Sequence, residues 1–326
     1  MLVPRSVEAY YPTAEDFQKP LEVIAFGSCN DEDKPQDYWP SIAAVEPDVW
    51  IWMGDNIYGD SRQAEVIEGK YTRQFEAGPY VRFREAVPII GTWDDHDFGE
   101  NDAGSWYPLR ATTQQLALDF LEEPAGTVRR QQGGLYTAYR FGPEGRQVQV
   151  ILLDTRYHMT RPGPEGDLLG EAQWRWLESQ LRSEAPEVTI LGSSIQFVAE
   201  DQGYEKWARF PKSRQRMVDL IARSGRAGVL FISGDRHIHE LSCWRAEALP
   251  YPLYDLTSSG LTHTWESFPG EPNRWRLAGP NNRRGFGVVR LDWSKEPVLI
   301  TLEIQSLDGT VVLTHSFERG LLTGGN

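Results

Sequence analysis

The sequence predicts an α/β fold in one large domain, and three observations lead to this prediction. Strand-like apolar runs alternate with helical runs through most of the chain, and only strands follow after about residue 240. No linker divides the chain, and six strand-like runs end in polar residues. Alternation of this kind is typical of a sheet covered by helices, with the last strands completing a second, largely antiparallel sheet. We therefore assign residues 1–20 to an N-terminal arm and residues 21–326 to a single domain.

The first half of the chain is expected to begin with an extended arm, because residues 1–20 contain three prolines and no periodicity. Apolar runs then predict strands at residues 21–26, 49–53 and 86–90. The segments between and after them favour helices near residues 36–46, over 62–85 with a break near Gly78-Pro79, and over 110–122.

The second half is expected to open with a hairpin formed by residues 135–141 and 147–153 around a Gly-Pro turn. Trp174, Leu177 and Leu181 have the spacing of an amphipathic helix over residues 171–182. A strand at 188–191, a helix that begins at Pro211 and a strand at 228–232 follow. The final strands are expected near residues 253–258, 286–291, 298–304 and 310–317.

Composition excludes several classes of protein. The chain has 326 residues and a net charge of −14, which argues against nucleic acid as a stable partner and against anionic membranes. No apolar run reaches transmembrane length. The N-terminus lacks an apolar signal core, so the sequence as given predicts a cytoplasmic protein. Residues 2–6 resemble part of a protease-tag site, so a periplasmic or secreted location stays open if a native signal was removed. The two cysteines do not indicate a disulfide framework, and nothing indicates the oligomeric state.

An acidic stretch after the third predicted strand is the strongest local signal. Five acids and one imidazole lie between Asp94 and Asp102, directly after an apolar run. Carboxylates at this density stay ionised only where water or a cation neutralises them. The alternative is a solvated acidic loop.

Six predicted strands end in residues of similar chemistry. Open α/β sheets bind ligands outside the carboxyl ends of their strands, so these side chains are expected to share one site. Carboxylate, amide and imidazole ligands suit hard or borderline metals, and a thiolate favours iron or zinc. The set exceeds the needs of one ion and predicts a two-metal centre, which is typical of in-line attack on phosphoryl groups. The strand ends are Cys29-Asn30, Asp55-Asn56, Asp94-Asp95-His96-Asp97, Asp154 with Arg156, Ser193-Ser194, and Asp235 with His237 and His239.

Seven motifs, spread in order over about residues 21–292, resemble the alkaline phosphatase D (PhoD-like) branch of the calcineurin-like metallophosphoesterases. They are Phe26-Gly27-Ser28-Cys29, Gly54-Asp55-Asn56-Ile57-Tyr58, Trp93-Asp94-Asp95-His96-Asp97, Leu153-Asp154-Thr155-Arg156, Leu169-Gly170-Glu171-Ala172-Gln173-Trp174, Ser233-Gly234-Asp235-Arg236-His237 and Leu256-Thr257-Ser258-Ser259-Gly260. The resemblance implies a four-layer sandwich of two packed mixed sheets flanked by helices. It also implies hydrolysis of phosphate esters by metal-activated water at a dinuclear centre. The implied cofactors are Fe3+ and Ca2+, with Zn2+ or Mn2+ as alternatives.

The resemblance also implies roles for individual residues. Asp55 matches the bridging carboxylate, and His96 matches the catalytic histidine. Cys29, Asp95, Asp235 and His237 match metal-binding positions. A tyrosine ligand is implied between Asp55 and Trp93, and Tyr71 is chosen over Tyr58 and Tyr80. The chain departs from the family in lacking the N-terminal β-domain of larger members and in having Asp97 where many have glutamate.

Several further residues have two interpretations. Cys29 is a metal ligand or a small buried apolar residue. Asn56 binds metal or only shapes a turn, and His239 shares the metal if it lies on the same strand face as His237. Arg156 holds phosphate oxygens or pairs with Asp154. The candidate catalytic residues are His96, Arg156 and Asp97, and the candidate substrate-binding residues are Arg156, Asn30 and His263.

The favoured function is therefore metal-dependent hydrolysis of a small-molecule phosphate ester. Cleavage of phosphodiesters or phospholipid head groups at the same site is the first alternative. A non-catalytic metal-binding or scaffold protein of the same fold is the second. A serine hydrolase is disfavoured because the chain has no Gly-x-Ser-x-Gly motif.

Overall fold

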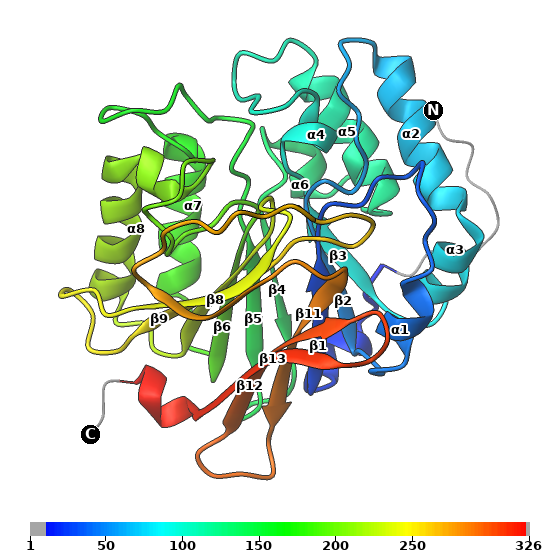
Figure 1. The fold of residues 1–326 in the computed structure, drawn as a ribbon. Helices are drawn as coiled ribbons and strands as arrows, with labels where there is room; N and C mark the ends of the chain where they lie inside the picture. The colour runs from blue at the N-terminus through cyan, green and yellow to red at the C-terminus, as the bar shows by residue number, and fades with distance from the viewer. Residues whose placement is uncertain (1–10, 324–326) are drawn as a thin grey trace.

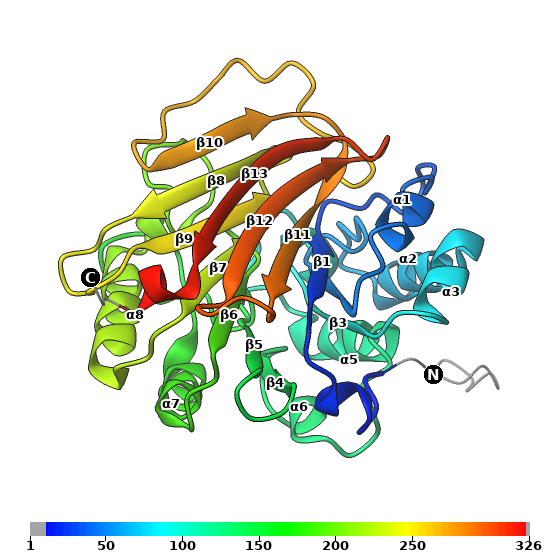
Figure 2. The same cartoon turned by 90° about the horizontal axis from the view of Figure 1, so that it is seen from below.

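Two β-sheets face each other between outer layers of helices in the computed structural model, which describes residues 11–323 (Figure 1). Helices α7 and α8 lie outside one sheet, and α1, α2, α3 and α5 lie outside the other (Figure 2). The predicted α/β class and four-layer architecture are confirmed. The individual elements explain how this arrangement brings the polar strand ends together.

The first sheet has six strands in the order β13-β12-β11-β1-β2-β3. Strands β1, β2 and β3 run parallel, and β11 pairs antiparallel with β1. Because β1, β2 and β3 are parallel, the residues that follow them emerge at one edge. The bounds are β1 Val23–Gly27, β2 Val49–Met53, β3 Ile89–Thr92, β11 Gly285–Asp292, β12 Leu299–Ser306 and β13 Val311–Glu318.

The second sheet has seven strands in the order β10-β8-β9-β7-β6-β5-β4. Strands β5, β6, β7 and β9 are parallel, while β4, β8 and β10 pair antiparallel with their neighbours. The bounds are β4 Thr137–Phe141, β5 Val148–Leu152, β6 Val188–Ser193, β7 Val229–Ser233, β8 His239–Trp244, β9 Leu253–Ser258 and β10 Arg276–Asn281.

The helices fill most of the connections between the parallel strands. The α-helices are α1 Trp39–Ala43, α2 Ala64–Glu76, α3 Gly78–Arg84, α4 Asp95–Phe98, α5 Arg110–Phe120, α6 Val128–Gln131, α7 Gly170–Arg182 and α8 Pro211–Ser224. Short 3-10 helices are η1 Asp16–Gln18, η2 Trp207–Arg209 and η3 Arg319–Leu322. Pro211 is the first residue of α8, where a missing amide hydrogen costs no helical hydrogen bond.

Strand β2 shows how the layers are held together. Its five residues are buried, and successive side chains point to opposite faces. Ile51 and Met53 belong to the apolar cluster that includes the second sheet. Trp50 and Trp52 belong to a separate cluster with Trp39 of α1 and the outer helices. Burying a large apolar side chain contributes roughly 1.5–3 kcal/mol, so both faces of this strand stabilise the sandwich.

The last strands differ from the expectation that they complete the second sheet. Strands β11, β12 and β13 extend the first sheet, whereas β8, β9 and β10 extend the second. Strands β8 and β10 were not predicted, since their residues are polar for much of their length. The end of the predicted arm also differs, because residues 16–18 form η1 and Phe17 packs on Tyr139 and Phe141 of β4. Residues 1–10 of the arm lie outside the described residues.

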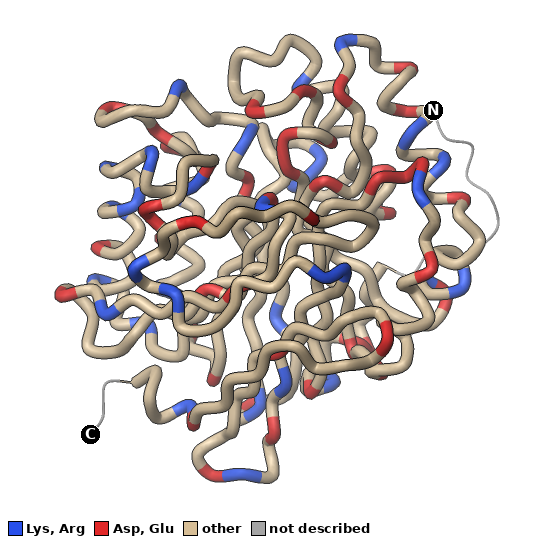
Figure 3. The backbone as a smooth tube through the Cα atoms, viewed as in Figure 1, with Lys and Arg blue, Asp and Glu red and all other residues tan. Residues whose placement is uncertain are grey.

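Acidic and basic residues are interspersed along the backbone (Figure 3). Within residues 11–323, none of the helices is both long enough and apolar enough to cross a lipid bilayer.

Candidate metal centre

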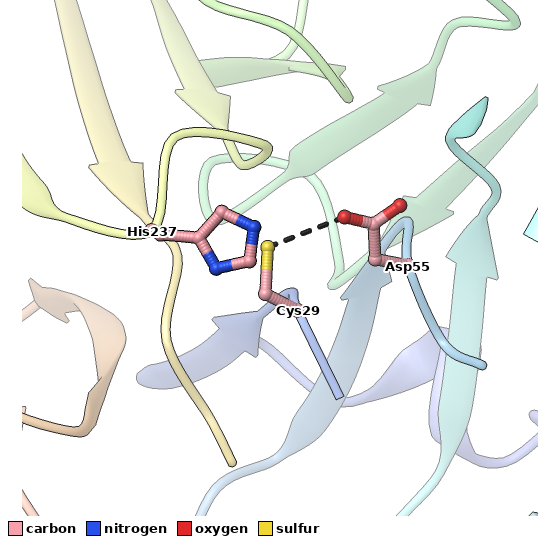
Figure 4. A group of neighbouring side chains, drawn as sticks. All are labelled: Cys29, Asp55 and His237. Carbon is pink, nitrogen blue, oxygen red and sulfur yellow. Dashed lines mark hydrogen bonds between the residues drawn. The ribbon is translucent and has the colours of Figure 1, made fainter. Parts of the chain in front are cut away.

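Three potential ligands from distant parts of the chain meet at the carboxyl ends of the strands. Cys29 follows β1, Asp55 follows β2, and His237 lies between β7 and β8. Figure 4 shows the three side chains close together, with Cys29 Sγ 3.3 Å from Asp55 Oδ2. One ligand atom from each lies within 4.8 Å of the others, which is the spacing of a shared metal ion.

A second group of potential ligands adjoins the first and shares Asp55 with it. Asp55, Asp95 and His96 satisfy the same 4.8 Å criterion. Asp95 in turn groups with Asp94 and Asp235. The first two groups therefore have the arrangement expected of two neighbouring cations with one shared carboxylate.

Four of these residues have left-handed backbone conformations. The φ angles are 60° at Cys29, 49° at Asp55, 68° at Asp235 and 54° at His237. Such conformations cost non-glycine residues roughly 1–3 kcal/mol each and concentrate at functional sites. The turns after β1, β2 and β7 thus direct side chains inward at the expense of backbone strain.

Buried acceptor atoms in the centre lack hydrogen-bond partners among the described residues. They include Asp55 Oδ1, Asn56 Oδ1 and Asp95 Oδ1. An unsatisfied buried acceptor costs about 1–3 kcal/mol, and a charged one costs more. A cation would satisfy these oxygens, so the residues present fit metal ions.

The pKa values of the buried side chains in the centre also fit bound metal ions. Burial raises the pKa of Asp55 well above its ordinary value, and the neighbouring Cys29 adds to the increase. Burial also raises the pKa of the Cys29 thiol to about 11, although the hydrogen bond with Ser259 acts in the opposite direction. A bound cation reverses this effect, because it favours the carboxylate and the thiolate.

Tyr58 is the tyrosine that lies beside the Cys29 group. Its hydroxyl is 3.5 Å from His237 Nε2, and burial together with Cys29 raises the pKa of the phenol. Tyr71, the tyrosine selected from the sequence, packs on Phe120 instead. The Tyr71 hydroxyl lies near Asp97 without a well-formed hydrogen bond to it.

Asp97 is fully buried and organises the loops around the centre. Its carboxylate accepts backbone hydrogen bonds from Asp94 at 2.6 Å, Asn56 at 3.2 Å and Asp55 at 3.3 Å. Burial raises the pKa of Asp97 to about 8, although the hydrogen bonds from the Asp94 and Asn56 amides lower it. The Asn56 side chain donates to the Thr92 carbonyl at 2.9 Å and so ties the same loop to β3.

His96 lies on α4 at the edge of a cavity, partly exposed. Its Nδ1 is 2.8 Å from Asp60 Oδ1, and its ring lies 4.3 Å from that of Tyr58. Burial acts to lower the pKa of His96, but Asp55, Asp60 and Asp95 raise it to about 10. Asp60 therefore fixes the orientation of the His96 ring, and Nε2 is the ring nitrogen that does not contact Asp60.

Arg156 lies fully buried beneath the acidic side chains and does not line the cavity. Its Nε donates to Asp94 Oδ1 at 2.5 Å, and its guanidinium is 2.6 Å from Glu205 Oε2. Asp154 instead accepts the Arg156 backbone amide at 2.8 Å, which shapes the turn after β5. Neither sequence-based interpretation of the Arg156 side chain included this partnership.

The remaining candidates from the sequence are Asn30, His239 and His263, and each has its own contacts. Asn30 is buried and donates to the Asn56 carbonyl and to Gln74. His239 begins β8, and its Nε2 is 2.9 Å from the Arg283 carbonyl. His239 belongs to none of the ligand groups found among residues 11–323. His263 is half-buried, with its ring 4.7 Å from that of His237.

A cavity of about 540 Å³ opens beside the two ligand groups. That volume lies within the roughly 300–1,000 Å³ typical of small-molecule sites. Its lining residues are Asp55, Asp95, His96, Asn101, Asp102, Gly203, Tyr204, Glu205, Arg209, Asp235, Arg236, His237 and Trp265.

Several cavity residues were missed by the sequence analysis. Glu205 groups with Asp95 and Asp102 within 4.8 Å, yet it comes from a loop with no motif. Tyr204, Arg209 and Trp265 likewise follow no predicted strand. Only the contacts formed on folding bring them to the site.

Comparison with known proteins identifies relatives at the sequence level. The sequence model for PhoD-like phosphatases matches residues 68–266, which is more than half of the chain. Alkaline phosphatase D from Bacillus subtilis (strain 168) is 23% identical over 274 residues. The alignment covers 67% of this chain but only 46% of that protein, so the chain spans about half the length of the curated relative.

Comparison with solved structures identifies the same fold. A structure of PhoD superimposes with a TM-score of 0.74 at 16% identity, covering 93% of this chain and 70% of the other. GAP50, described as the anchor in the inner membrane complex of Plasmodium, gives a TM-score of 0.58 at 15% identity, covering 92% of this chain and 89% of the other. A dimetal phosphatase from Danio rerio gives a TM-score of 0.57 at 12% identity, covering 92% of this chain and 100% of the other. Together with the family match, these findings show that the chain belongs to the PhoD-like phosphatase family.

Proposed function

We propose that the protein hydrolyses phosphate esters at a centre of two metal ions. The observation that carries this proposal is the sharing of Asp55 between two adjacent ligand groups. Cys29 and His237 stand on one side of it, and Asp95 and His96 on the other. Family membership supports the proposal, and the cavity provides room for a substrate beside both groups.

We assign Cys29, Asp55 and His237 to the first ion, with Tyr58 as the tyrosine ligand in place of Tyr71. The nearness of Tyr58 to His237 and Cys29 supports this replacement. A thiolate and an imidazole favour iron or zinc in this position.

We assign Asp55 and Asp95 to the second ion, with the unpartnered Asn56 Oδ1 as a further oxygen ligand. Oxygen ligands suit calcium or manganese. The proposed pair is Fe3+ with Ca2+, and Zn2+ and Mn2+ are the alternatives. Asp235 contributes through its group with Asp94 and Asp95.

Bound at these groups, the two ions would polarise the phosphoryl oxygens and activate water for in-line attack. His96 then has the position to donate a hydrogen bond or a proton to the departing oxygen, with Asp60 holding its Nδ1. Arg156 and Asp97 act as positioning residues, because their buried side chains hold Asp94 and the loops after β2 and β3. Neither Asn30 nor His263 is among the described residues that line the cavity. Asn30 supports the Asn56 loop, and the His263 ring lies 4.7 Å from that of His237.

Two other functions would use the same site. Diesters, including phospholipid head groups, would enter the same cavity, and nothing in the ligand groups selects against them. A non-catalytic role is favoured by one observation, namely that GAP50 is described as an anchor and has a similar fold. The unsatisfied ligand atoms of this chain favour the metal-dependent enzyme over that role.

The test combines metal analysis with turnover. Protein reconstituted with iron and calcium together, and in parallel with zinc or with manganese, is expected to bind about two ions per chain. It should hydrolyse a chromogenic monoester, a chromogenic diester or both. Fewer than about one ion per chain, or two ions without turnover of any ester, would contradict the proposal, and the latter would support the non-catalytic role.

Replacement of the shared carboxylate is the sharpest variant. Asp55→Ala is expected to lose metal and activity together, because both ions depend on Asp55. Asp37→Ala is the matched control, since it removes an exposed carboxylate that pairs with Arg284. If Asp55→Ala kept both ions and normal turnover, Asp55 would be a turn residue only.

A further inference from the structure

The cavity continues beyond the ligand groups to a wall of different chemistry. Besides the carboxylates and imidazoles, the lining includes two aromatic residues, Tyr204 and Trp265, and two arginines, Arg209 and Arg236, which are called the wall below. An ester bound with its phosphoryl group at the proposed metal centre would place its alcohol part along this wall. This wall would then determine which alcohols are accepted, which rests on the proposed function.

Arg209 differs from the other arginine of the wall. Arg236 is buried, forms an ion pair with Glu271 at 2.6 Å and lies 4.3 Å from the Tyr204 ring centroid. Arg209 is exposed, and within the described part of the chain no hydrogen bond or ion pair engages its guanidinium. The Arg209 backbone is held in place by a hydrogen bond of 2.9 Å from the Gly163 amide to the Arg209 carbonyl. Arg209 is also the last residue of η2.

A second cationic side chain, that of Lys206, lies near Arg209. Lys206 is buried nearby, and its ammonium donates to the backbone carbonyls of Gln202 and Tyr204 rather than to a carboxylate. Burial lowers the pKa of Lys206, and the charges of Arg209 and Arg236 lower it further. Glu271 and Asp201 act in the opposite direction on Lys206, and Glu271 pairs with Arg236. Of the two arginines that line the cavity, Arg209 is therefore the one without a carboxylate partner among residues 11–323.

Two aromatic rings complete the wall. Tyr204 keeps 48% of its surface exposed, and its ring centroid lies 5.4 Å from that of Trp265 in an edge-on arrangement. Aromatic faces of this kind bind flat apolar groups. The wall thus combines a surface for a planar group with a guanidinium that has no partner among residues 11–323.

We propose that this wall binds the leaving group of the ester, and that Arg209 selects leaving groups that carry a second negative charge. The favoured substrates are phosphate esters of planar alcohols that bear an anionic group such as a carboxylate or a second phosphate. A guanidinium forms charge-assisted hydrogen bonds with either group, often in a bidentate manner. Arg209 is therefore a specificity-determining residue outside the metal centre.

The test compares matched monoesters that differ in the second charge. Phenyl phosphate, 4-carboxyphenyl phosphate and 1,4-phenylene bisphosphate serve as the neutral, carboxylate and phosphate probes. The quantity measured is kcat/KM for each probe, expressed as the ratio of anionic to neutral probe. Comparing this ratio between variants removes the intrinsic reactivity of each ester.

Arg209→Ala is expected to lower the ratio roughly 3- to 10-fold, the size of one partly exposed charge-assisted contact. Arg209→Lys should retain part of the preference, since it keeps the charge and loses the planar fork. Arg223→Ala, which removes an exposed arginine from the last turn of α8, is the control for net charge and should leave the ratio unchanged. A comparison of the two anionic probes shows whether Arg209 raises kcat/KM more for the carboxylate or for the phosphate.

Two outcomes overturn the inference, and they differ from failure of the proposed function. If Arg209→Ala slows all three probes equally, Arg209 acts only on the shared phosphoryl group or through the general field. If it changes none of them, the wall does not contact the leaving group. If the metal-loaded wild-type protein hydrolyses no probe, the proposed function itself fails.

Discussion

At the residue scale, His96 has two possible roles that its contacts make separable. It groups with Asp55 and Asp95 closely enough to bind metal. It is also oriented by Asp60 through Nδ1, and it lines the cavity. A ligand and a proton donor respond differently to replacement, so the role can be measured.

We predict that His96→Asn keeps most of the metal and loses turnover, with the larger loss on esters of poor leaving groups. Positioned proton donors contribute roughly 10²–10⁴-fold, and an activated nitrophenyl ester needs little of this help. Rates on a nitrophenyl and an alkyl phosphate, with metal content of the same samples, test the prediction. Asp60→Asn, which keeps an acceptor for Nδ1, should give a smaller loss with the same pattern. Loss of metal with an equal decrease on both esters would make His96 a ligand.

At the scale of elements, the site depends on tight turns at the ends of parallel strands. The turn after β2 begins at Gly54, whose φ is +96°, and continues through Asp55 at +49°. A side chain at Gly54 would place its Cβ 2.4 Å from Asp94 Cβ and 2.6 Å from the Asp94 amide nitrogen. This turn and the acidic loop after β3 are therefore packed against each other without room for a methyl group.

Gly54→Ala is predicted to destabilise the fold by about 1–3 kcal/mol and to weaken metal binding, because it strains the turn and displaces Asp94. Gly69→Ala is the matched control, since Gly69 lies inside α2 with no atom within 4 Å of the added Cβ. That change should stabilise the protein by about 0.5–1 kcal/mol. Urea unfolding in chelator gives both free energies. Equal behaviour of the two variants would show that the turn tolerates a side chain.

At the scale of the whole molecule, one apolar cluster connects the two sheets and α7 and α8. The candidate metal centre lies where the strand ends of both sheets meet, with Cys29 and Asp55 from the first and His237 from the second. Cations that bind there would hold the sheets together and would also neutralise carboxylates that otherwise repel one another.

Metal removal is accordingly predicted to lower the unfolding temperature by several degrees in a single transition. An ion present at about 100 times its Kd stabilises the folded state by about 2.7 kcal/mol. Calorimetry with increasing free metal, then with chelator, measures the shift. Asp55→Ala should unfold at a temperature independent of metal. Two separate transitions in the wild-type protein would contradict the single-domain assignment of residues 21–326.

The sequence by itself determined the class of fold, most strands and the chemistry at their ends. Apolar runs such as residues 49–53 define buried strands, and a cysteine, carboxylates and histidines follow these runs in the sequence. Side chains at the carboxyl ends of parallel strands are expected to share one edge of the sheet. The local pattern could also locate the acidic stretch that follows β3. These features depend on neighbours along the chain.

Only the tertiary structure decided which residues share the site and what each one contacts. Tyr58 and Tyr71 both lie within the predicted interval, but the fold places one beside His237 and the other against Phe120. Arg156 is bound by Asp94 and Glu205, and Glu205 comes from a loop without a motif. Strands β11 to β13 joined the first sheet because β11 pairs with β1, a contact between residues more than 250 positions apart. Such choices depend on long-range packing and on partners for buried charges, which periodicity and local spacing do not encode.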